Sequence, residues 1–184
     1  MTLCAATLLA AAVLLALGLP LLWNGPVVEH TAKAFPRSTL AAVLFFGAGA
    51  LWFLYIISQL TSADFGDYKK YLLAVFAAAG LASFFVSKDF LAVRGIAILV
   101  LLAARPMLDS SLAYSPPPTS RVVLNAALYV AIPLAIYLGT MPYQVRDFFL
   151  WLFQRPTRPR FFGIIFVAYG IVLAVLATTY HNTY

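Results

Sequence analysis

Charge is what this 184-residue chain has least of. Only 10% of its residues are Asp, Glu, Lys or Arg, whereas 64% are hydrophobic and the mean hydropathy is +0.94. In an ordinary soluble domain about a quarter of the residues are charged, which is enough to cover a surface that faces water. The shortage of charge therefore argues against a soluble globular protein and indicates that the chain folds in a lipid bilayer.

Cysteine and histidine are nearly as scarce. Cys4 is the single cysteine, which excludes an intrachain disulfide and a multi-cysteine metal site. The two histidines, His30 and His181, are expected on opposite sides of the bilayer, so a monomer could not bring them to one haem or zinc ion. The sequence also has no serine elbow and no glycine-rich phosphate loop. We therefore expect a non-enzymatic protein without a cofactor or a metal.

Long hydrophobic runs are what the sequence has in abundance. Six of them cover residues 3–23, 39–60, 71–87, 90–107, 122–139 and 161–180. Each is close to the ~20 residues that a helix needs to cross a hydrocarbon core about 30 Å thick. None alternates apolar with polar residues as the strands of a transmembrane barrel do. The runs predict an all-α integral membrane protein, a bundle of six transmembrane helices forming one polytopic domain over residues 1–184.

A shorter amphipathic segment separates the fifth and sixth runs. Residues 143–153 begin polar and end in Phe-Phe-Leu-Trp-Leu-Phe, which predicts a short helix lying in the membrane interface. An ordinary amphipathic linker is the alternative. Arg155, Arg158 and Arg160 follow at once and are candidate contacts for anionic lipid headgroups on the cytoplasmic face.

The distribution of basic residues predicts the orientation in the membrane. If all six runs span, eight of the twelve Lys and Arg residues face one side: Lys33, Arg37, Lys88, Arg94, Arg146, Arg155, Arg158 and Arg160. That side should be cytoplasmic, which places both termini outside, in a plasma (inner) membrane. Because the basic residues sit at span ends and in short loops, the net charge of +6 indicates contact with lipid headgroups and not with nucleic acid.

Charged residues on the fourth run form a candidate polar seam. Arg94 and Arg105 are eleven residues apart, about three helical turns, and therefore lie on nearly the same face of a helix. Asp109 could pair with Arg105, although Pro106 predicts that the helix is already ending near Ala104. The seam could hold an anion, a lipid headgroup or a partner's carboxylate. We expect instead that both arginines extend to opposite interfaces while their stems cover apolar surface.

Two kinds of function fit these features. The first is a non-enzymatic accessory, scaffold or assembly subunit that works through helix–helix contacts, as a homo-oligomer or with another membrane protein. Small residues spaced at four, such as Ala78 and Ala82, allow the close backbone approach that such contacts need. The alternative is a small oligomeric transporter or channel that uses the seam on the fourth span. A seam that lines a hydrated cavity would favour transport, and one that faces lipid would favour a scaffold.

Overall fold

The computed structural model describes residues 1–61, 65–86, 89–112 and 121–181, with residues 180 and 181 described as backbone only. Within these ranges the regular structure is helical throughout, without a strand. Six helical stretches are long and apolar enough to cross a membrane: Leu3–Trp23, Thr39–Ser58, Gly66–Val86, Leu91–Leu112, Arg121–Thr140 and Thr157–Thr179. The expected all-helical class with six spans of membrane length is therefore confirmed.

The chain divides into two compact units, and three helices contribute to both. Unit 1 comprises Met1–Lys33, Ala103–Leu134 and Asp147–Tyr184, and unit 2 comprises Ala34–Leu102 and Ala135–Arg146. The shared helices are α6 (Leu91–Leu112), α7 (Arg121–Thr140) and α8 (Tyr143–Leu152).

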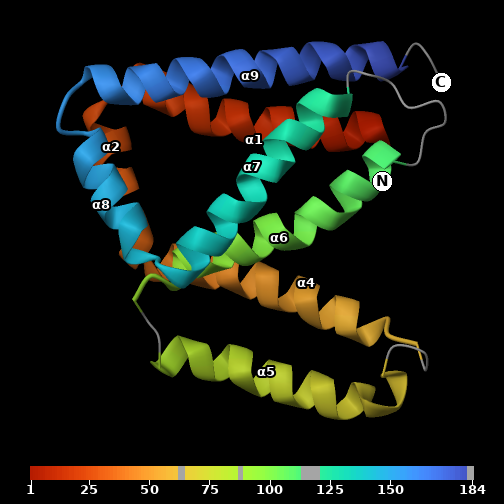
Figure 1. Cartoon of the computed structure of the whole chain (residues 1–184). Helices are drawn as coiled ribbons and strands as arrows, with labels where there is room; N and C mark the ends of the chain where they lie inside the picture. The colour runs from red at the N-terminus through yellow and green to blue at the C-terminus, as the bar shows by residue number, and fades with distance from the viewer. Residues whose placement is uncertain (62–64, 87–88, 113–120, 182–184) are drawn as a thin grey trace. The chain divides into compact units, whose positions relative to one another are not determined.

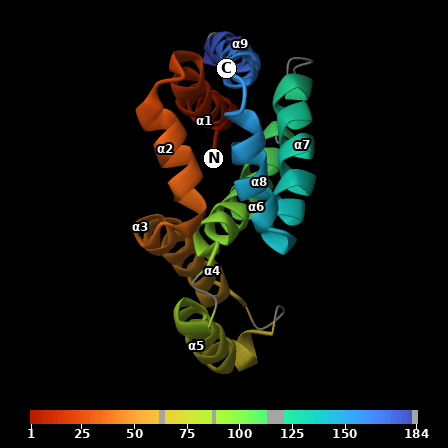
Figure 2. The ribbon, with the colours of Figure 1, turned by 90° about the vertical axis from the view of Figure 1, so that its left-hand side faces the viewer.

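Unit 1 is built on two long helices, α1 (Leu3–Trp23) and α9 (Thr157–His181), which run side by side in opposite directions (Figures 1 and 2). Glycines allow their close approach. A Cβ added to Gly163 would lie 2.8 Å from the backbone nitrogen of Leu22, and one added to Gly18 would lie 2.8 Å from Cγ2 of Val167. In lipid, where apolar burial does not drive helix association, such tight packing is a main source of stability.

Parts of α6 and α7 complete the core of unit 1. Its buried residues come from all four helices: Leu3, Ala6, Ala11, Met107, Leu124, Leu128 and Leu173. Hydrogen bonds also join these helices. The Tyr169 hydroxyl of α9 donates to the Val123 carbonyl of α7 at 2.7 Å, and the Cys4 thiol of α1 donates to the Ala177 carbonyl of α9 at 3.4 Å.

Helix α1 ends at an asparagine in the left-handed conformation. Asn24 adopts a left-handed conformation (φ 49°) and its N–H bonds to the Pro20 carbonyl, which ends the helix. A short helix that the sequence analysis did not anticipate, α2 (Pro26–Ala34), follows immediately. Proline is favourable at the first helical position, and Lys33 pairs with Glu29 one turn earlier at 2.5 Å.

Unit 2 begins with the second span, which contains a π-helical turn. A 3₁₀ turn, η1 (Phe35–Arg37), leads to Ser38, whose side chain accepts from the Ala41 N–H and caps α3 (Thr39–Ala41). The π-helix η2 (Ala42–Phe46) and then α4 (Gly47–Ser58) continue the span. Gly95 of α6 packs directly on η2, since an added Cβ would overlap the backbone of Phe45 and Phe46.

The third span consists of η4 (Gly66–Tyr68) and α5 (Lys69–Val86), and α5 lies alongside α4 (Figures 1 and 2). Two edge-to-face ring pairs join them, Phe46 with Phe84 at 5.3 Å and Phe53 with Phe76 at 5.1 Å between centroids. None of the residues of α5 is buried.

The fourth helix corrects one expectation. The sequence analysis ended the fourth run at residue 107 and expected the helix to be ending already near Ala104, but α6 continues through Pro106 to Leu112. A helix in lipid tolerates an internal proline when the freed backbone groups find other partners. Beyond Pro106, the Ser110 hydroxyl bonds to the Met107 carbonyl at 2.6 Å and the Ser111 hydroxyl to the Leu108 carbonyl at 2.8 Å. These bonds supply extra partners to the last turns.

Candidate functional site

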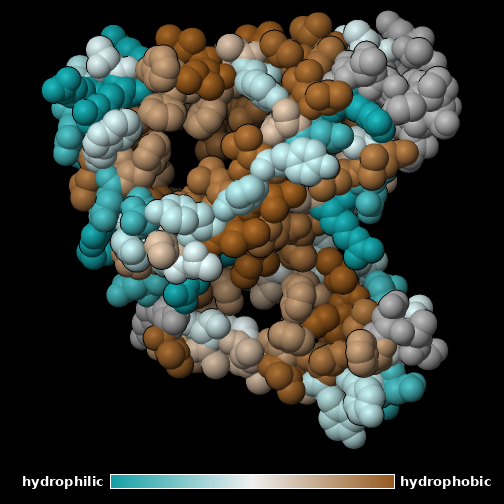
Figure 3. All heavy atoms as spheres, in the orientation of Figure 1, coloured by the Kyte–Doolittle hydropathy of each residue, from teal (hydrophilic) through white to brown (hydrophobic). Residues whose placement is uncertain are grey.

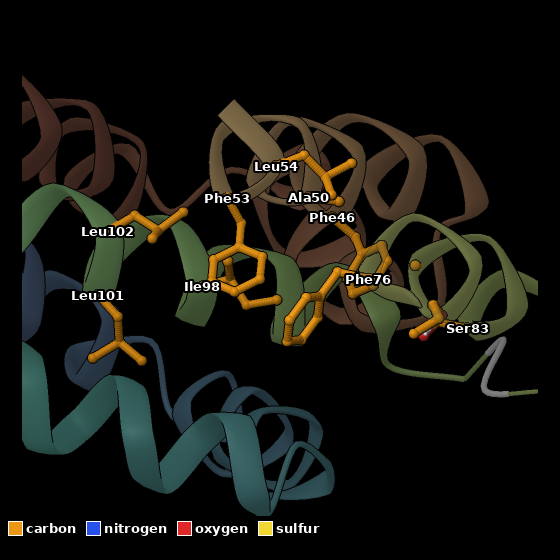
Figure 4. Close-up of a pocket in the computed structure, with 11 residues that line it drawn as sticks. Phe46, Ala50, Phe53, Leu54, Phe76, Ser83, Ile98, Leu101 and Leu102 are labelled. Carbon is orange, nitrogen blue, oxygen red and sulfur yellow. Dashed lines mark hydrogen bonds between the residues drawn. The ribbon is translucent and has the colours of Figure 1, made fainter. Parts of the chain in front are cut away.

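An apolar pocket lies within unit 2, between α4, α5 and α6 (Figure 4). Its volume is about 390 Å³. The lining side chains come from all three helices: Phe46, Ala50, Phe53, Leu54, Phe76, Ala79, Gly80, Ser83, Ile98, Leu101 and Leu102.

The order of large and small residues along α4 and α5 creates this pocket. The two phenylalanine pairs hold the helices apart at two levels, about two helical turns from one another. Between these levels the facing residues are small, and a Cβ added to Gly80 would lie 4.0 Å from Cβ of Ala50. Ile98, Leu101 and Leu102 of α6 form the third wall. The pocket is therefore left open because small residues occupy the positions that larger side chains would fill.

The chemistry of the pocket suits a hydrocarbon. Ser83 is the single polar side chain of the lining, and its hydroxyl already donates to the Ala79 carbonyl at 2.8 Å. No charged side chain is part of the lining. Phe76, Ala79 and Leu101 of the lining remain exposed, so the pocket opens to the surface of unit 2. Apolar walls of this kind suit an apolar occupant that enters from the surroundings.

Arg94, the first residue of the candidate seam, lies near one end of this pocket. On α6 it precedes Ile98 by one turn and Leu101 by two, so all three fall within about 60° of one another around the helix. Arg94 is half-buried, and no hydrogen bond or ion pair joins it to another residue within the described ranges. A second cation in unit 2, Arg37, lies over the Phe90 ring with its guanidinium carbon 6.0 Å from the ring centroid.

The other two seam residues belong to unit 1 and do not line the pocket. Arg105 and Asp109 form an ion pair at 3.9 Å, which shows that α6 remains helical there. Their side chains are 86% and 69% exposed, and an exposed pair of this kind contributes little to stability in water. The structure thus brings Arg105 and Asp109 together. Among the described residues, no ion pair or hydrogen bond links either of them to Arg94.

The three arginines after α8 have different surroundings. Arg158 folds back on α8, where its Nη1 donates to the Trp151 carbonyl at 2.6 Å and to Oε1 of Gln154 at 3.3 Å. Its guanidinium carbon also lies 4.2 Å from the Trp151 ring centroid, a cation–π contact. Arg158 therefore positions the corner between α8 and α9. By contrast, Arg155 and Arg160 are exposed and have no side-chain partner among the described residues.

Aromatic side chains surround this corner. Phe162 of α9 makes edge-to-face contacts with Phe148 at 5.7 Å and with Trp151 at 6.3 Å, both in α8. The amide of Asn24 at the end of α1 donates to the Pro156 carbonyl at 3.3 Å. Hydrophilic residues gather over α2 and the start of α9, whereas hydrophobic residues cover much of the rest of α9 (Figure 3). Basic and aromatic residues next to an apolar helix are typical of the membrane interface.

No group of three or more His, Cys, Asp or Glu residues that could hold a metal ion occurs in the part of the chain that the structure describes. One buried polar atom there lacks a partner, Oδ1 of Asn125 in α7. Lys88, one of the eight basic residues counted on the predicted cytoplasmic side, lies outside the described residues.

The sequence analysis identified the arginines but missed the pocket. The available signal was the run of small residues Ala77–Gly80 in α5 and Gly47–Ala50 at the start of α4, each of them near phenylalanines two turns apart. No protein-family model matches the chain, and comparisons with curated proteins and with solved structures also found no match.

Proposed function

We propose that the chain is a multi-pass integral membrane protein that works as a non-enzymatic accessory, scaffold or assembly subunit through helix–helix contacts. One observation carries this proposal: α5 has the length and hydropathy of a membrane span, yet none of its residues is buried. A span with so much unused surface is available to a neighbouring helix. The six apolar helices support insertion in a membrane.

The outer face of α5 suits such a neighbour. Ala74, Ala78 and Ala82 are exposed and spaced at four, so they form a stripe of small residues along the helix. Ala79 and Ser83, which lie next to this stripe in sequence, line the pocket, and Ala79 is exposed at its opening. Small residues let two backbones approach closely, which is how helices associate in lipid. The proposed partner of this stripe is a second copy of the chain.

The proposed setting is a plasma (inner) membrane, with both termini outside and the α8–α9 corner on the cytoplasmic side. The excess of Lys and Arg on that side supports this orientation. Arg155 and Arg160 are exposed there and would meet the headgroups of anionic lipids.

The transporter alternative has less support. A hydrated pathway needs polar groups along its wall, but the pocket of unit 2 is lined by apolar side chains and excludes the charged seam residues from its lining. Arg105 and Asp109 are exposed and paired with one another. These features favour contacts with lipid and helices over a pathway for ions.

Two matched variants test the assembly. Ala78→Leu adds bulk to the exposed stripe, and Ala79→Leu adds the same bulk to the next residue, which faces the pocket. Two differently tagged copies of the chain are expressed together and one is purified in mild detergent. The wild type and Ala79→Leu should recover the other copy, whereas Ala78→Leu should recover several-fold less of it. Equal recovery in all three, or none with the wild type, would contradict assembly through α5.

A further inference from the structure

We propose that the pocket between α4, α5 and α6 binds one acyl chain of a membrane lipid and that Arg94 holds the anionic headgroup of the same lipid. This inference rests on the proposed insertion in a membrane but is independent of assembly through α5. It joins two features of unit 2 that nothing else in the structure explains: an apolar pocket without a filling side chain, and a half-buried arginine without a partner among the described residues.

The size and opening of the pocket suit a slender ligand. Its volume of about 390 Å³ lies at the lower end of the range of small-ligand sites, about 300–1,000 Å³. Phe76, Ala79 and Leu101 of the lining remain exposed, so a ligand can enter from the surface of unit 2. One flexible acyl chain meets both conditions, and the cross-linking experiment below distinguishes it from a helix that covers the opening.

The lining selects a hydrocarbon over a polar ligand. Binding pockets for polar molecules contain a few donors and acceptors that orient the ligand. Here the Ser83 hydroxyl is bonded within its own helix, and the remaining lining atoms belong to apolar side chains or glycine. Phe46, Phe53 and Phe76 supply ring surfaces at both levels of the pocket (Figure 4). A saturated or unsaturated acyl chain satisfies these walls without stranding a polar group.

Arg94 extends the site to a headgroup. It lies one turn before Ile98, on the face of α6 that lines the pocket, in the first turns of the helix. A chain lying along Ile98 and Leu101 would thus bring its headgroup toward Arg94. A guanidinium binds phosphate with two parallel hydrogen bonds, and the positive end of the α6 dipole lies at the same end of the helix. The lipid class that fits is an anionic phospholipid, with one chain in the pocket and the phosphate at Arg94.

The experiment measures lipid on the full-length protein. The chain is reconstituted in nanodiscs of phosphatidylcholine and phosphatidylglycerol, transferred to mild detergent, and its retained lipids are counted by native mass spectrometry. The wild type should retain about one phosphatidylglycerol for each chain. Ala79→Leu should lose most of it, whereas Ala78→Leu should keep it, because only residue 79 lines the pocket. Arg94→Gln should weaken retention about tenfold, the effect of losing one charge-assisted contact. Arg105→Gln, on the same helix but outside the pocket lining, should leave it unchanged.

A second measurement keeps the inference open to refutation if Ala79→Leu does not fold. A phosphatidylglycerol with a photoreactive diazirine near the end of one chain is cross-linked to the wild type, and the labelled peptides are mapped. Labels should fall on the pocket walls of α4, α5 and α6. Labels spread evenly over outward-facing residues would show annular lipid only. Cross-links between protein chains at these walls would show that a helix occupies the pocket. Either result overturns the acyl-chain site. Equal retention by Ala78→Leu and Ala79→Leu would also refute it, while recovery of tagged copies reports separately on assembly.

Discussion

At the residue scale, glycine marks the places where two backbones meet. Gly18, Gly163 and Gly170 line the contact of α1 with α9, and Gly95 lies directly against the π-helix η2. By contrast, nothing lies within 4 Å of a Cβ added to Gly47. Gly49, two residues further along the same helix, packs closely, with an added Cβ only 3.0 Å from Cγ2 of Ile98. The sequence alone does not distinguish Gly47 from Gly49, because the difference depends on which face meets α6.

The contrast between Gly95 and Gly47 yields a prediction for stability. Gly95→Ala should lower the free energy of unfolding by about 3 kcal/mol, because the methyl group would overlap the backbone of η2, which cannot move aside as a side chain can. Gly47→Ala should be neutral or stabilise the protein by up to about 1 kcal/mol, since alanine favours a helix and the space is open. Thermal unfolding in detergent, followed by circular dichroism, compares the two. Similar melting temperatures would show that α6 does not contact η2 as described.

At the element scale, hydropathy and length predicted the six long helices, because each run must satisfy its backbone within the segment. A short helix within residues 143–153 was also expected, and α8 (Tyr143–Leu152) confirms the helix, whereas its place in the membrane interface stays a prediction. Two features were missed. The segment of α2 is too short and too polar to resemble a membrane span. Only Pro26 and the spacing of Glu29 and Lys33 indicated a helix. The π-helix η2 packs against Gly95, a residue distant in sequence, and no pattern within residues 42–46 indicates that contact.

The three arginines at the α8–α9 corner should separate into two classes. Arg158→Gln should destabilise the protein by about 1–2 kcal/mol, because it removes the bond to the Trp151 carbonyl and the cation–π contact. The double change Arg155→Gln with Arg160→Gln should leave stability in neutral lipid unchanged, since both side chains are exposed. It should nevertheless reduce the gain in stability on moving from neutral to anionic nanodiscs, by about 1 kcal/mol for each arginine.

Melting temperatures of the two variants and the wild type in both kinds of nanodisc test this division. The wild type should melt higher in anionic lipid, Arg158→Gln should melt lower in both lipids, and the double variant should lose only the difference between them. If Arg158→Gln instead removed the preference for anionic lipid without lowering stability in neutral lipid, its assigned positioning role would be wrong.

At the scale of the whole molecule, apolar side chains are exposed on nearly every long helix, for example Leu51, Val75, Leu81 and Ile171. In water such a surface would aggregate, whereas in a bilayer it contacts lipid of the same polarity. Fewer than half of the residues in any candidate span are buried within the protein, so lipid or a partner must cover most of the remaining surface. The sequence predicted this setting from composition, but it could not predict which exposed faces meet lipid and which meet a protein.

The orientation in the membrane is the prediction that concerns the whole chain. Unit 1 places the end of α1 beside the start of α9, where Asn24 bonds to the Pro156 carbonyl. Lys33 follows the end of α1, Arg155 precedes α9, and Arg158 and Arg160 lie in the first turn of α9. Their charges should hold this side in the cytoplasm. A reporter enzyme that works only in the cytoplasm should be active when inserted within residues 156–159 and inactive when fused after Tyr184. Replacing Arg155, Arg158 and Arg160 with Gln removes three of the eight basic residues on that side and should increase the fraction of inverted molecules. Cytoplasmic activity of the unmodified chain's fusion at Tyr184 would reverse the proposed orientation and would place the corner between α8 and α9 on the outside.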